Sequence, residues 1–269
     1  MRSFILFLLA SFTTMVSLHA KEGVKIVSNT KDLKSNTISS TNVFISDTKV
    51  VIENKGKDNS SIIFDASAEI FTYVDNSKKE YYQFDKATLV QLKEQVKMFA
   101  TMMKQFASQM PEDQKKKLDK IMNPSSGGPV TYSKSPTSEK VKSWTTTRYE
   151  GKQGADKVMS VYIASFESVG VAKDKFSAMN KMMDFAKENL QEISGLLPAS
   201  GGLSGMSFDD ESPILNEGLP VKTLAYDKGV AKNENTVEEV VLSDIPEAKF
   251  SIPSGYTRKT VDIQNQLGK

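Results

Sequence analysis

Two amphipathic helical patterns interrupt a chain that otherwise reads as short strands. The first places apolar residues three or four positions apart, at Leu89, Leu92, Val96, Phe99, Met103, Phe106 and Met110. The second does so at Ala172, Phe176, Met179, Met183, Ala186, Leu190 and Ile193. This spacing is typical of helices with one apolar face. Exposing such a face would forgo on the order of 10 kcal/mol, so each helix must lie against another apolar surface.

The strand-like segments can supply that surface. Runs of β-branched and aromatic residues lie between Val24 and Phe84, between Val130 and Ile163, and between Val221 and Ile252, with turn residues separating them. The sequence therefore predicts an α+β fold in which two long amphipathic helices cover one face of an antiparallel sheet. We expect one domain over residues 21–269, with glycine-rich loops near 123–129 and 198–205. The order strands, helix, glycine-rich loop occurs twice, so an internal duplication is the alternative.

The first 20 residues have the pattern of a cleavable signal peptide. Arg2 precedes an apolar run from Phe4 to Ala10 that is too short to span a bilayer, and Ala20 offers a small residue for cleavage. We therefore expect a periplasmic or secreted protein. An uncleaved leader that anchors the chain at a membrane surface is the alternative. No later segment is apolar for long enough to be a transmembrane helix.

Loss of the leader would remove the single histidine, His19, from a chain that has no cysteine. Without imidazole or thiol, the mature chain cannot build a Ser-His-Asp or Cys-His catalytic centre, a tetrahedral zinc site or a disulfide. We expect a non-enzymatic protein with no metal and no cofactor.

The remaining charges also exclude a class of partner. Removing Arg2 leaves 34 basic residues against 33 acidic ones, and only Arg148 and Arg258 among the basic residues are arginines. Because arginine is the residue suited to bidentate recognition of phosphates and bases, we expect no nucleic-acid partner.

Carboxylates are the one catalytic route that the composition leaves open. Acidic residues adjoin at Asp209-Asp210-Glu211 and at Glu238-Glu239, and two carboxylates suffice for glycoside hydrolysis. Neighbouring residues on a strand point to opposite faces, however, so Glu238 and Glu239 are not expected to converge. A carboxylate-based hydrolase is the third-ranked interpretation.

Methionine makes the helical stripes adaptable, which suits a surface that accepts apolar shapes. The predicted lining of an apolar cavity between the helices and the sheet consists of Leu92, Val96, Phe99, Met102, Met103, Phe106, Phe176, Met179 and Met183. Two alternatives stay open. The same residues suit an ordinary packed core, and the pairs Met98 with Met102 and Met179 with Met183 have the spacing of a thioether copper site.

The segment Phe250-Ser251-Ile252-Pro253-Ser254-Gly255-Tyr256 resembles the Phe-x-Ile-Pro-x-Gly-Tyr close of an exported bacterial family known only as a domain of unknown function. The hairpin at 71–82 that leads into a Met-rich helix, and Gly218-Leu219-Pro220-Val221, also resemble that family. Its fold is similar to lipoprotein-carrier (LolA-like) proteins. The resemblance implies a half-open β-barrel with helices over its concave side, and an apolar cavity between them.

These observations together predict an exported binding protein of the bacterial envelope that holds a lipid or acyl chain. The second interpretation is an envelope or surface module that binds another protein and has no small ligand.

Overall fold

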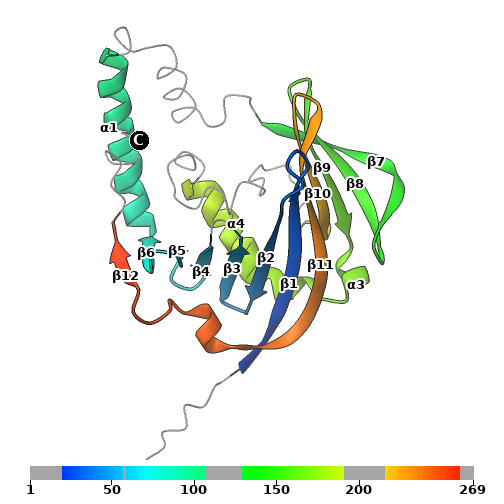
Figure 1. The fold of residues 1–269 in the computed structure, drawn as a ribbon, viewed down its shortest axis with the longest axis horizontal. Helices are drawn as coiled ribbons and strands as arrows, with labels where there is room; N and C mark the ends of the chain where they lie inside the picture. Colours follow the sequence, from blue (N-terminus) through cyan, green and yellow to red (C-terminus); the bar gives the residue numbers. More distant parts are fainter. Residues whose placement is uncertain (1–19, 57–58, 107–128, 191–215, 261–269) are drawn as a thin grey trace, which may run out of the picture.

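The computed structural model describes residues 20–56, 59–106, 129–190 and 216–260. Its twelve strands form one sheet that curves strongly and does not close on itself (Figure 1). The strands are β1 (Ala20–Asp32), β2 (Ile38–Ile45), β3 (Lys49–Lys55), β4 (Ser60–Asp65), β5 (Ile70–Asp75), β6 (Glu80–Phe84), β7 (Val130–Val141), β8 (Trp144–Gln153), β9 (Asp156–Ala164), β10 (Leu219–Asp227), β11 (Val230–Pro246) and β12 (Thr257–Lys259). The helices are α1 (Lys86–Phe106), α3 (Phe166–Val169) and α4 (Ser177–Leu190), with the 3₁₀ turns η2 (Lys173–Phe176) and η4 (Glu247–Phe250).

Two antiparallel meanders meet at the centre of the sheet. The strand order is β12-β6-β5-β4-β3-β2-β1-β11-β10-β9-β8-β7, so β1 and β11 join the first meander to the second. Every neighbouring pair is antiparallel except β12 with β6. The predicted large, curved antiparallel sheet is confirmed. The predicted domain boundaries stay predictions, since residues 1–19 and most of both glycine-rich loops lie outside the described part.

The two helices contribute unequally to the covering of the sheet. Helix α4 lies along the concave face over β1 to β4, which we call the inner face (Figure 1). Helix α1 starts beside β6, and its first turns reach the core through Leu89 and Leu92. The prediction of two helices covering one face is therefore confirmed only in part.

The second helix differs from its prediction in both extent and orientation. A continuous helix from Ala172 was expected, but Ala172 is extended, with φ −66° and ψ 146°, and the 3₁₀ turn η2 precedes the α-helix. This turn still places Phe176 in the same core as α4. The side chains that α4 buries are Ala178, Met179, Met182, Phe185, Ala186 and Leu190, whereas Met183 lies at the margin.

Strands β3 to β5 are covered on both faces, as their continuous apolar runs require. Their outer face carries Val51, Ile63 and Val74, all at most 7% exposed. The segment that follows β11 covers these residues with Phe250, Ile252 and Tyr256. The Phe-x-Ile-Pro-x-Gly-Tyr motif is therefore the outer layer of the first meander.

Backbone bonds and one glycine fasten this outer layer. Gly255 has φ 79°, a left-handed conformation that glycine adopts without strain. The N–H of Thr257 then donates to the Lys79 carbonyl at 2.9 Å, and β12 pairs in parallel with β6. Lys249 Nζ also lies 2.6 Å from Glu53 Oε1. The motif thus covers an apolar surface and protects the edge of β6.

Candidate functional site

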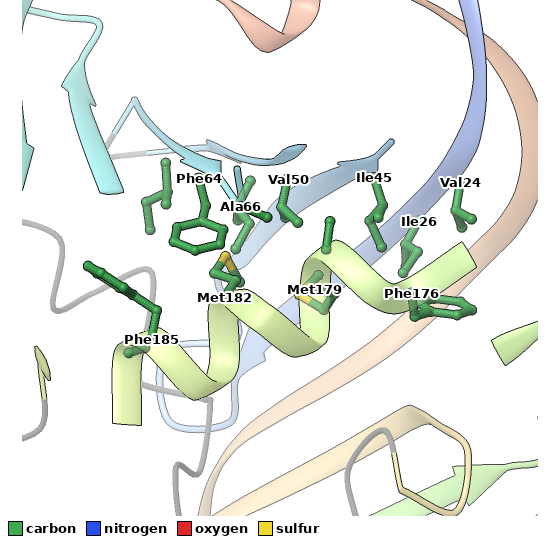
Figure 2. Close-up of a cluster of buried hydrophobic side chains, with 14 of the residues drawn as sticks. Val24, Ile26, Ile45, Val50, Phe64, Ala66, Phe176, Met179, Met182 and Phe185 are labelled. Atoms are coloured by element: carbon green, nitrogen blue, oxygen red, sulfur yellow. The ribbon is translucent and has the colours of Figure 1, made fainter. Parts of the chain in front are cut away.

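The inner face under α4 is filled by the protein's own side chains. Figure 2 shows Phe176, Met179 and Met182 of this region directed at side chains of β1, β2, β3 and β4. The ring centroids of Phe64 and Phe185 are 5.4 Å apart. Residues in this contact are at most 7% exposed, and burial of each large side chain contributes about 1.5–3 kcal/mol. This part of the predicted lining is packed core.

The predicted lining residues of η2 and α4 fall into two groups. Phe176 and Met179 are 0% and 5% exposed and belong to the core itself. Met183 is half-buried and packs against the edge of the core. Met179 and Met183 therefore differ in environment, although both were predicted to line one surface.

Helix α1 is seated by its N-terminal half. Asp85 caps it, because its Oδ1 accepts the N–H of Thr88 at 2.7 Å. Leu92 is 5% exposed, and Val96 is half-buried against the same core. Lys93 Nζ donates to the carbonyl of Glu188 on α4 at 3.3 Å. This half of α1 is thus fixed to α4.

The second half of α1 carries exposed methionines. Met98 is 68% exposed and Met102 is 48% exposed, one helical turn apart. The side chains of Phe99, Met103 and Phe106 lie outside the described part. Met102, predicted to line the cavity, therefore presents much of its surface to solvent.

The inner face continues beyond α4 into the second meander. Side chains alternate between the two faces along a strand, so Thr30 of β1 lies on the same inner face as Ile26. Residues that pair directly across an antiparallel ladder also carry their side chains on the same face. A row of direct pairs then crosses the sheet from Thr30 through Asn235, Thr223, Val161 and Tyr149 to Lys134. We call this part of the inner face, together with Ile163, Met159 and Tyr132, the far inner face.

The far inner face is apolar at its centre and polar at its margin. Tyr149, Val161 and Ile163 are at most 5% exposed, and the half-buried Tyr132 and Met159 pack against them. Towards β1, the amide of Asn235 donates to Thr30 Oγ1 at 2.9 Å. Sequence patterns missed this surface because it depends on pairing between strands that are far apart in the chain.

One charged cluster borders the far inner face. The hydroxyl of Tyr149 donates to Glu217, and Lys134 Nζ lies 3.2 Å from Glu217 Oε2. The hydrogen bond from Tyr149, followed by the interaction with Lys134, lowers the pKa of Glu217 below its ordinary value. Burial, followed by the bond to Glu217, raises the pKa of Tyr149. The cluster keeps Glu217 ionised and Tyr149 protonated near neutral pH.

The adjacent carboxylates do not form a two-carboxylate centre with each other. Glu238 pairs with Lys142 of the β7–β8 turn, whereas Glu239 lies 2.8 Å from Lys25 on β1. Asp209, Asp210 and Glu211 lie outside the described part. Within residues 20–56, 59–106, 129–190 and 216–260, no three acidic or histidine side chains gather as a metal site. No helix in these ranges is long and apolar enough to cross a membrane.

The fold and this site define a curved, unclosed antiparallel sheet with one helix seated in its concavity. No protein-family model matches the sequence, and no curated protein sequence matches it significantly.

Several solved structures are similar in outline. An uncharacterized conserved protein from Thermus thermophilus has a TM-score of 0.45 at 7% identity, over 88% of this chain and 89% of that chain. PNGF-II has a TM-score of 0.41 at 7% identity, over 93% of this chain and 33% of that chain. The Pseudomonas aeruginosa MucA/MucB complex has a TM-score of 0.38 at 6% identity, over 87% of this chain and 56% of that chain. At these scores, the function must be argued from the residues of this chain.

Proposed function

We propose that this protein is an exported, non-catalytic binding protein of the bacterial envelope that holds a lipid or acyl chain on the concave side of its sheet. The observation that carries the proposal is the apolar margin where α1 and α4 flank the core. Val96 and Met183 are half-buried there, and Met102 is 48% exposed further along α1. The proposed ligand lies along this margin, beside the packed core under α4.

The chemistry of the margins supports an apolar ligand. Val96 and Met183 are half-buried where α1 and α4 flank the core, and Met102 is partly exposed further along α1. Methionine has three rotatable bonds and a polarisable sulfur, so it adapts to an acyl chain without a fixed shape. Leu92, Val96 and Met183 are the lining residues that we assign to the ligand, and Phe176 and Met179 belong to the supporting core.

Two parts of the proposal, export and a non-catalytic role, are supported by the sequence. The leader directs the chain out of the cytoplasm, and its removal leaves neither histidine nor cysteine. Binding through shape and apolar surface is then the function that the remaining side chains serve best.

Organic extraction of protein purified from its native host, followed by mass spectrometry, tests the proposal. We expect a co-purifying lipid, and displacement of a fluorescent fatty acid by that lipid. Met183→Gln should reduce the bound lipid several-fold, because it places an amide at the apolar margin. Val90→Gln, at a residue 58% exposed on α1, is the matched control and should leave binding unchanged. Absence of both bound lipid and fatty-acid binding would show that the proposal is wrong.

A second candidate function is a protein-interaction module without a small ligand. The specific observation in its favour is the pair of exposed methionines, Met98 and Met102, on one side of α1. A photo-crosslinking residue at position 102 should then give a discrete protein adduct in cells, and the same residue at Asp184, exposed on α4, should not. No adduct at position 102 would exclude α1 as the contact.

A further inference from the structure

Five turns of the sheet lie at one end of the strands. Because antiparallel strands alternate in direction, the turns that follow β1, β3, β5, β8 and β10 all fall at this end, which we call the hairpin end. Each has an exposed lysine in the turn or within two residues of it. These lysines are Lys34, Lys55, Lys78, Lys79, Lys152 and Lys228.

Acidic residues at the hairpin end are fewer. Among the described residues of these turns and of the three nearest positions in each adjoining strand, there are nine lysines (the six above, Lys31, Lys157 and Lys232) and six acids (Asp32, Glu53, Asp75, Glu80, Asp156 and Asp227). Four of these acids have a lysine partner: Glu53 pairs with Lys249 at 2.6 Å, Asp75 with Lys78 at 2.9 Å, Glu80 with Lys259 at 3.3 Å, and Asp227 with Lys232 at 3.8 Å.

The opposite end of the strands differs in charge. Among the described residues, acids outnumber lysines in its turns, connections and adjoining strand ends. The acids are Glu22, Asp47, Asp65, Glu69, Asp85, Glu139, Glu167, Asp174, Glu217, Asp244 and Glu247, and the lysines are Lys21, Lys49, Lys86, Lys140, Lys142, Lys173, Lys175 and Lys249. The two ends of a nearly neutral chain therefore differ in charge, and the hairpin end is the basic one.

Two exposed apolar side chains accompany the lysines. Ile38, the first residue of β2, is 67% exposed, and Val230, the first residue of β11, is 60% exposed. The hairpins β1–β2, β8–β9 and β10–β11 all point to the top of Figure 1. The first and third are joined by the N–H of Leu33, which donates to the Lys232 carbonyl at 2.8 Å.

These tips are held in fixed conformations. Asp32 Oδ1 accepts the backbone N–H groups of Lys34 at 2.8 Å and Ser35 at 2.7 Å. Lys228 and Gly229 have φ values of 50° and 77°, the left-handed pair of a tight two-residue hairpin turn. Because these turns are already ordered, little conformational entropy is lost when they bind.

We propose that the hairpin end docks on an anionic lipid bilayer. Lysine ammonium groups pair with lipid phosphates as compact point charges, while Ile38 and Val230 enter the interface between headgroups and acyl chains. Exposed apolar side chains at the tips favour a lipid surface over a nucleic acid. The absence of arginine from all five turns in the sequence favours it too. The docking does not depend on the proposed bound ligand, because it uses only exposed tips.

Vesicle co-sedimentation tests the docking. The purified protein, with the same N-terminus in every variant, is mixed with vesicles of phosphatidylcholine alone or with added phosphatidylglycerol. We expect binding to the anionic vesicles that weakens with salt. Each lysine near such a surface strengthens binding about fivefold, so Lys34→Gln with Lys152→Gln and Lys228→Gln should lower the partition coefficient about a hundredfold. Ile38→Ser with Val230→Ser should weaken binding while preserving its salt dependence.

The control removes the same charge from the opposite end. Lys21→Gln with Lys86→Gln and Lys173→Gln changes three exposed lysines there and should leave vesicle binding within about twofold, because they lie away from the bilayer. Equal weakening by both triple variants, or no binding to anionic vesicles, would overturn the proposal. Loss of duplex-DNA binding in the first variant, without any vesicle binding, would instead identify a nucleic-acid surface. Lipid extraction tests the ligand separately, so the two proposals fail independently.

Discussion

The hydroxyl of Tyr256 donates a hydrogen bond to Asn76 Oδ1 at 3.1 Å, and the amide of Asn76 donates to Ser61 Oγ at 3.0 Å. These two bonds connect the end of the Phe-x-Ile-Pro-x-Gly-Tyr motif to the β5–β6 turn and to β4. The tyrosine that closes the motif is therefore an anchor of the outer layer. In this structure the motif has a structural role, separate from the far inner face.

Tyr256→Phe should destabilise the protein by about 1 kcal/mol, because it removes a part-buried hydrogen bond but retains the aromatic ring. Urea unfolding measures the change in the free energy of unfolding. Asn76→Ala completes a double-mutant cycle in which the two changes should be less than additive, since both remove the same bond. Full additivity would mean that Tyr256 and Asn76 contribute independently.

Gly255→Ala should destabilise the protein by about 1–2 kcal/mol through backbone strain alone. Gly255 has φ 79°, and an added Cβ would meet no atom within 4 Å, so no steric clash contributes. Ser254→Ala, at an exposed neighbour with ordinary geometry, should change the stability by less than about 0.5 kcal/mol. Thermal unfolding of both variants checks this, and equal stabilities would contradict the anchoring role of the glycine.

The strands and α1 could be predicted because their signals are local. The cap Asp85 and the spacing of Leu89, Leu92 and Val96 identify α1, and runs such as Ile70–Val74 identify strands. The extent of α4 could not be predicted, because the apolar spacing continues through Phe176 although the backbone there is a 3₁₀ turn. Periodicity gives the faces of a helix only where the helix is regular.

The site was harder to predict than the fold. Phe176 and Met179 were predicted to line a cavity and lie in the core under α4, because one helical period cannot distinguish a packed core from the lining of a cavity. The far inner face was missed because Val161 and Tyr149 belong to the second meander, which joins the first only where β1 pairs with β11. The paired residues of β1 and β11 are about 200 positions apart in the chain. No local pattern reports that pairing.

Phe185→Ala should cost about 3–5 kcal/mol, because Phe185 is 4% exposed and its ring lies 5.4 Å from that of Phe64. Met98→Ala should change the free energy of unfolding by less than about 0.5 kcal/mol, since Met98 is 68% exposed. Urea unfolding measures the free energy of unfolding of both variants, one changed in the core and the other on the exposed face of α1. Equal costs would show that the face bearing Met98 is covered in solution.

The cluster of Tyr149, Glu217 and Lys134 should make part of the stability depend on pH. The pKa of Glu217 lies below its ordinary value near 4.5, chiefly because Tyr149 donates a hydrogen bond to the carboxylate. Because the pKa of Glu217 is lower in the folded state than in the unfolded state, its ionisation stabilises the fold at pH values above the unfolded-state pKa. This stabilisation is lost as the pH falls through the folded-state pKa. The difference in free energy of unfolding between wild type and Tyr149→Phe should therefore shrink as pH falls from 7 to 3.

Glu217→Gln provides the control for this pH dependence. Its amide cannot ionise, so Tyr149→Phe made in the Glu217→Gln background should have the same cost at pH 7 and at pH 3. Urea titrations of the four proteins at both pH values measure the coupling between Tyr149 and Glu217 directly. A coupling that is equally large at both values would mean that the hydrogen bond does not depend on the charge of Glu217. The cluster would then be a packing contact with no role in holding that carboxylate ionised at the margin of the far inner face.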